Sequence, residues 1–187
     1  MEPIRLTSPS VKRRSAKGRD PIAAFSIREA LRRADLILES PCQGHLPRVA
    51  GRGSLVHRFV LPLALMPTTN NRFGQKAWAL AAMKDRVFRM MHLQHPRIRP
   101  EPLQGRPLVR LVRFSTTEPD AFADWAKMAV DCLCVPRQPK RPGGRRKLGL
   151  GFLQDDAPRF VEIASWWERA KQGEGLVLIE VWTGETP

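Results

Sequence analysis

Apolar residues recur with helical spacing in three stretches of the chain. Residues 75–93 lack proline and glycine and are rich in Ala, Met and Leu, so they predict the clearest helix. Residues 119–134 predict a second helix, with one apolar side and one side that carries charges. Residues 21–39 predict a third, because an Asp-Pro pair at 20–21 is a favourable start and a Ser-Pro pair at 40–41 ends the pattern.

Strand-like segments lie between and after these helices. Residues 56–65 and 107–114 are rich in Val, Leu and Phe, and 160–163 and 176–184 continue this pattern near the C-terminus. The turn-like sequence KQGEG at 171–175 predicts that the last two strands form an antiparallel hairpin. The order of elements predicts an α+β fold with a small mixed sheet packed against two helices, without the regular alternation of a Rossmann fold.

Breaks in the pattern divide the chain into an extension and a folded module. Residues 1–54 predict a basic N-terminal extension. Within it, residues 1–20 are expected to be disordered, a helix lies near 21–39, and a Pro- and Gly-containing linker follows. That helix could dock on the main body, dock on a partner, or contact DNA through its arginines. Residues 55–187 predict the module, interrupted by a basic Pro/Gly-rich loop at 135–150 that is expected to project into solvent.

The charge balance indicates a polyanionic partner. The 187 residues include 32 Lys and Arg against 18 Asp and Glu, a net charge of +14. Nucleic acid is the commonest partner for such a charge, and basic residues occur in every segment. A basic tail or simple solubility charge would be the alternatives.

Compartment signals are sparse. No run of 18 apolar residues occurs, which predicts no membrane span, and the N-terminus lacks the apolar segment of a secretory signal. The three cysteines, Cys42, Cys132 and Cys134, do not form a disulfide framework and are expected to be small apolar fillers. We therefore expect a cytoplasmic protein.

A stripe of charged residues stands out on the predicted helix at 119–134. At roughly 100° per residue, Asp120, Asp124, Lys127 and Asp131 share one side of the helix. A second acidic pair, Asp155-Asp156, follows after the basic loop.

Carboxylates gathered in a basic chain suggest a metal site. Close carboxylates repel each other unless a cation neutralises them, and Mg²⁺ prefers carboxylate oxygens. A metal held beside a phosphate would polarise the phosphoryl oxygen and activate water, as hydrolysis of DNA or RNA requires. A solvated helix face with a Lys127–Asp131 pair, and a simple turn at Asp155-Asp156, would explain the same residues.

Other chemistries have little support. The chain contains no HExxH, no GxxxxGK[ST], no GxGxxG and no GxSxG sequence. Zincin, phosphate-loop, dinucleotide-binding and serine-hydrolase functions are therefore not indicated.

Four short sequences, together with the order of elements over about residues 56–183, carry a resemblance to a known family. They are FVLPLALMPTTNNRF at 59–73, DAFADWAK followed by MAVDCL, FLQDDAPRFVE at 152–162, and WWERAKQGEGLVLIEVW. In this order they resemble the first strand and Asn/Arg loop, the D-x-D-N-x-x-K motif and following Asp, the D-D pair and next strand, and the terminal hairpin of the RusA-type Holliday junction resolvases.

The resemblance implies a Mg²⁺-dependent endonuclease that cuts branched DNA, especially four-way junctions, as a homodimer. Its implied metal ligands are Asp120, Asp124 and Asp156 with Asp155 beside them, and Lys127 is the implied catalytic-site cation. Its implied DNA-binding residues are Asn70, Asn71 and Arg72, and the basic loop adds Lys140, Arg141, Arg145 and Arg146 as a phosphate clamp.

Two alignments of the acidic motif stay open. The family spacing D-x-D is D-x-x-x-D here, and Trp125 follows the second Asp. Aligning on the acids makes Asp120 and Asp124 ligands, whereas aligning on Lys127 and Asp131 puts alanines at the acidic positions and implies a catalytically inactive DNA-binding protein. A third interpretation, an RNA-binding or assembly protein, rests on charge alone.

Overall fold

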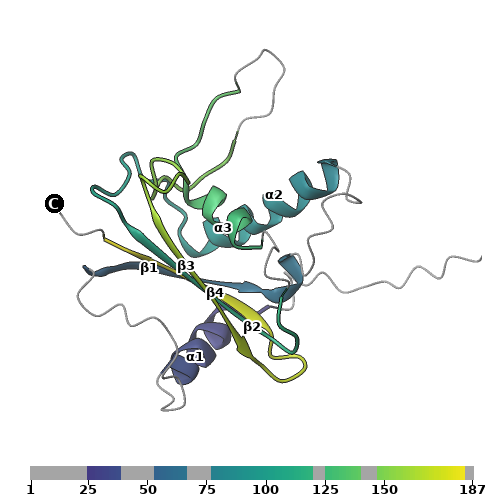
Figure 1. Ribbon diagram of the computed structural model, residues 1–187. Coiled ribbons are helices and arrows are strands. Elements are labelled where there is room, and N and C mark those ends of the chain that lie inside the picture. Colours follow the sequence, from purple (N-terminus) through teal and green to yellow (C-terminus); the bar gives the residue numbers. More distant parts are fainter. Residues whose placement is uncertain (1–24, 39–52, 67–76, 120–124, 140–146, 184–187) are drawn as a thin grey trace, which may run out of the picture.

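A four-stranded mixed sheet forms the centre of the molecule (Figure 1). The computed structural model describes residues 25–38, 53–66, 77–119, 125–139 and 147–183. The strands are β1 (Leu55–Pro62), β2 (Leu108–Ser115), β3 (Glu162–Arg169) and β4 (Leu176–Trp182), in the spatial order β1-β4-β2-β3. β4 is antiparallel to both β1 and β2, and β3 is parallel to β2. The predicted α+β class with a mixed sheet is confirmed.

The predicted hairpin between the last two strands is wrong. β4 lies between β1 and β2, so β2 separates it from β3. The physical reason is burial on both faces: six of the seven β4 residues are buried, as expected for a central strand rather than a terminal hairpin arm. The turn at 171–175 therefore carries the chain past the end of β2, and the Phe114 carbonyl lies 3.3 Å from an ideal Cβ position on Gly175.

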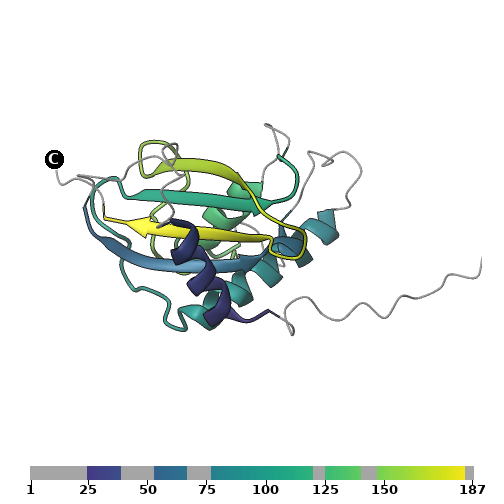
Figure 2. The same ribbon diagram turned by 90° about the horizontal axis from the view of Figure 1, so that it is seen from below.

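Helices cover both faces of the sheet. Helices α2 (Ala77–Gln94) and α3 (Trp125–Leu133) lie on one face, and α1 (Ile27–Leu38) lies on the other, as Figures 1 and 2 show. A 3-10 turn, η1 (Leu63–Leu65), follows β1. The larger core cluster joins α2, α3 and the sheet, and it contains Phe59, Met91, Leu111, Trp125, Leu133, Phe152 and Ile179. Cys132 and Cys134 are buried as expected.

Helix α1 begins later than predicted. Phe25 and Ser26 are not helical, and Ser26 caps the first turn: its carbonyl accepts from the amide of Ala30 at 3.0 Å, and its hydroxyl from the amide of Glu29 at 3.3 Å. The sequence Ser-x-x-Glu at 26–29 is a capping-box signal, which explains why α1 begins directly after Ser26; the Asp-Pro pair at 20–21 lies outside the described residues. Of the predicted helix, the described part docks on the main body through buried Ala30 and Ala34.

A buried carboxylate ties the sheet together beneath α1. Glu180 on β4 is fully buried and is ion-paired with Arg58 on β1, at 2.8 Å, and with Arg110 on β2. Arg58 is also paired with Asp35 of α1. This network fixes the helix to the face opposite α2 and α3.

No helix in the described ranges is both long and apolar enough to cross a membrane.

Candidate functional site at the end of α3

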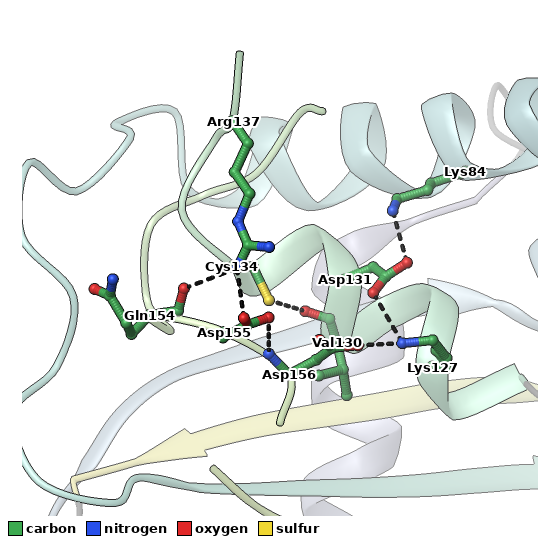
Figure 3. A network of polar contacts seen from close by, with 9 residues as sticks. All are labelled: Lys84, Lys127, Val130, Asp131, Cys134, Arg137, Gln154, Asp155 and Asp156. Atoms are coloured by element: carbon green, nitrogen blue, oxygen red, sulfur yellow. Dashed lines mark hydrogen bonds and ion pairs between the residues drawn. The ribbon is translucent and has the colours of Figure 1, made fainter. Parts of the chain in front are cut away.

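Lys127 on α3 brings together two carboxylates from distant parts of the chain. Its ammonium lies 3.4 Å from Oδ1 of Asp131, one helical turn later, and is also ion-paired with Asp156, which lies in the loop before β3 (Figure 3). The predicted i,i+4 relation of Lys127 and Asp131 is therefore present. Trp125, Ala129 and Leu133 on the other side of α3 are buried, so packing turns the charged side toward solvent.

Helix α2 supplies a second cation to the same place. The Lys84 ammonium lies 2.7 Å from Oδ2 of Asp131, so Asp131 accepts from Lys84 on one oxygen and from Lys127 on the other. Both side chains of the Lys84–Asp131 pair are less than a third exposed. The pair therefore links the two helices that cover this face of the sheet.

The acidic pair at 155–156 forms a compact turn beside α3. The amide of Asp156 donates to Oδ1 of Asp155 at 2.8 Å, and the Arg137 guanidinium lies 2.8 Å from Oδ2 of Asp155. Arg137 and Lys147 exchange backbone hydrogen bonds of 3.1 and 3.0 Å, which join the two arms of the loop at 135–150. Asp155 is thus tied to the base of the basic loop, while Asp156 is tied to α3.

The electrostatics of the site keep its groups charged. The hydrogen bond to Asp156 raises the pKa of Lys127, and the same bond lowers the pKa of Asp156. Burial on its own would raise the pKa of Asp131, but the hydrogen bond from Lys84 and the charges of both lysines outweigh it and lower that pKa. Asp131 and Asp156 are therefore anions and Lys127 is a cation at neutral pH.

We call these six side chains the carboxylate cluster: Asp131, Asp155 and Asp156 with Lys84, Lys127 and Arg137. Its three negative charges are balanced by three positive ones, all within the described part of the chain. The Lys127 ammonium is half exposed, so an anionic ligand such as a phosphate could reach it from solvent. Such a ligand would compete for Lys127 with Asp131 and Asp156.

The fit to Mg²⁺ is partial. Carboxylate oxygens are the right donors for a hard divalent ion, and Asp131 and Asp156 already converge on one cation. Among the described residues, however, no three His, Cys, Asp or Glu side chains are grouped closely enough to hold a metal. A metal at this place would need ligands beyond the carboxylates of the described residues.

Three of the predicted site residues lie together, namely Lys127, Asp155 and Asp156. The remainder fall outside the described residues, so the structure does not test them; they are Asp120, Asp124, Asn70, Asn71, Arg72, Lys140, Arg141, Arg145 and Arg146.

The sequence pattern does not assign Lys84 or Arg137 to this site, and it gives Asp131 a place on the stripe and a pair with Lys127 but no part in metal binding. Lys84 lies within a long helix chosen for its apolar residues, and its partner is 47 residues away, so no local pattern indicates the contact. Arg137 lies in the basic loop at 135–150, and nothing in the sequence distinguishes it from the other cations there. Asp131 had one usable signal, its i,i+4 spacing from Lys127.

Comparisons of the chain with protein-family models, with curated proteins and with solved structures found no match.

Proposed function

We propose that this protein is a Mg²⁺-dependent endonuclease of RusA-like type that hydrolyses phosphodiester bonds in branched DNA. The observation that carries the proposal is the contact of Lys127 with both Asp131 and Asp156. Folding brings a lysine, an acid one turn later and an acid from the D-D pair to one solvent-facing place in a strongly basic chain. The resemblance predicts that Lys127 and the D-D pair share one site, and an unrelated solvated helix face would not require the contact of Lys127 with Asp156.

The residues have distinct parts in the proposed reaction. Asp120, Asp124 and Asp156, with Asp155 beside them, would hold the ion, which when bound would supply Lewis-acid activation of water and of the phosphoryl oxygen. Lys127 remains charged and half exposed, so it stabilises the negative charge that develops on the phosphate. Lys84 holds Asp131 in place from α2, and Arg137 holds Asp155. Two such sites are needed to cut two strands of a junction, which favours a homodimer.

One observation favours a second candidate, a DNA-binding protein of the same fold without nuclease activity. Each described carboxylate of the carboxylate cluster already has a lysine or arginine partner, so the described part of the site is neutral without a metal. Such a protein would bind junctions equally well with and without divalent ions.

The test is cleavage of a synthetic four-way junction by the purified protein in Mg²⁺ and in EDTA. We expect paired nicks in Mg²⁺ only, and their loss in Asp156→Asn with junction affinity retained. Glu174→Gln, in the exposed turn before β4, is the matched control and should cut normally. If the unmodified protein binds the junction but does not cleave it, the nuclease proposal is refuted and the binding protein is favoured. If Asp156→Asn cleaves as well as the unmodified protein, the assigned site is wrong.

A further inference from the structure

The cations of the carboxylate cluster are engaged by its own acids. Lys84, Lys127 and Arg137 each form at least one ion pair there, and an ammonium or guanidinium shared with a carboxylate is less available to a phosphate. DNA carries a charge about every 1.7 Å along its axis, so it needs more cations than this site offers. The additional contacts must come from neighbouring surfaces.

The outer face of α2 presents two arginines that have no such partners. Arg86 and Arg89 are exposed, and neither forms a hydrogen bond or ion pair within the ranges that the structure describes. On α1, Glu29 engages Arg32, at 2.9 Å, and Arg33, at 3.1 Å, whereas Arg28 is exposed and has no ion pair within the described ranges. Of these two helices, α2 therefore presents a pair of available arginines one helical turn apart, and α1 presents a single one.

Helix geometry places these arginines on the solvent side of the helical layer. Lys84 faces α3, where it is paired with Asp131. Arg86 follows two residues later, about 200° around the helix, and Arg89 lies one turn further on the same side. Arg86 and Arg89 are separated by about 4.5 Å along the helix axis, close to the ~3.4 Å axial spacing of phosphates on one DNA strand.

We propose that this α2 basic face, formed by Arg86 and Arg89, contacts the phosphates of a duplex arm of DNA while the scissile strand lies at the carboxylate cluster. The described arms of the loop at 135–150 rise on the same side of the sheet as α2 and α3 (Figure 1), so the site has basic residues on both flanks. The inference rests on the proposed function for its ligand, but it concerns binding rather than cleavage.

The experiment measures binding of a four-way junction in EDTA, by fluorescence anisotropy, over a range of salt concentrations. Each lost phosphate contact lowers the slope of log K against log salt by about 0.9. We expect Arg86→Ala/Arg89→Ala to lower the slope by about 1.8, because alanine preserves the exposed helix while removing both contacts. Circular dichroism checks that the variant is folded.

The matched control is Arg28→Ala/Arg32→Ala, which removes the same net charge from α1 on the opposite face of the sheet. Its slope should stay within about 0.5 of the unmodified protein, since a general loss of charge is not a lost contact. Equal slopes for the two double variants, or a larger drop in the α1 variant, would overturn the inference. Failure of the nuclease proposal looks different: the unmodified protein then binds the junction but does not cut it in Mg²⁺.

Discussion

Lys84 on α2 and Asp131 on α3 are paired at 2.7 Å, and this contact joins the two helices above the sheet. Asp131 holds its charge because Lys84 and Lys127 together overcome the effect of burial on its pKa. A residue of the proposed active site is thus also part of the packing between helices. Changes at this place should alter both stability and chemistry.

Replacing Lys84 by Met should destabilise the protein by about 1 kcal/mol at pH 7, because Asp131 keeps only one of its two cations. Because the pKa of Asp131 is lower in the folded protein, the stabilisation that its ion pairs provide depends on pH. This stabilisation is fully present above pH 3.8, the ordinary pKa, and is lost as the pH falls through the lower pKa of the folded state. Urea unfolding at pH 7 and in acid measures both effects. Lys171→Met, at an exposed turn, is the control; a variant as stable as that control would refute the role of the pair.

Lys127→Met should lower single-turnover cleavage of a four-way junction by about 100-fold, because it removes the cation that stabilises the transition state. In the proposed complex Lys127 would make only one of many phosphate contacts, so junction affinity should change by no more than about threefold. Cleavage rates and anisotropy binding curves on the same preparations separate the two effects. A large loss of affinity with an unchanged cleavage rate would show that Lys127 binds DNA without assisting the reaction.

Glu180→Gln should cost about 3 kcal/mol of unfolding free energy, because it leaves the guanidinium groups of Arg58 and Arg110 without their buried counter-charge. Glu180 is fully buried, whereas Glu174 at the β3–β4 turn is exposed. Glu174→Gln should therefore change stability by less than about 0.5 kcal/mol. Chemical denaturation of both variants provides the comparison, and similar midpoints would contradict the structural role of Glu180.

The sequence predicts elements better than their arrangement. Helix α2 and strand β1 follow from local composition, and their observed bounds differ from the predicted ones by a few residues. The place of β4 between β1 and β2 depends on pairing with distant strands, so the local turn signal at 171–175 misled the prediction.

The candidate site shows the same limit. The i,i+4 spacing of Lys127 and Asp131 is a local property and can be read from the sequence. The contact of Lys127 with Asp156 needed a family resemblance to be suspected, because 29 residues separate them. Lys84 has neither a local pattern nor a matching motif, and only the packing of α2 on α3 reveals its partner.

The environment of His57 on β1 leads us to expect that the protein loses stability in mild acid. Burial lowers its pKa below the ordinary 6.5, and the neighbouring His95 lowers it further. The rings of His57 and His95 are 4.9 Å apart, and their buried Nε2 and Nδ1 atoms have no hydrogen-bond partner in the described part of the chain. The folded state therefore favours the neutral ring of His57.

A group with a lowered folded pKa of this kind binds its proton more readily in the unfolded chain. Stability should be constant above about pH 6.5 and should fall as the pH drops towards 5. His57→Phe keeps the aromatic contact with Phe59 and removes the titrating ring, so its stability should depend less on pH in this range. Urea unfolding at pH 7.5, 6 and 5 compares the two proteins at these pH values. Parallel pH profiles for the variant and the unmodified protein would assign the acid sensitivity to other groups.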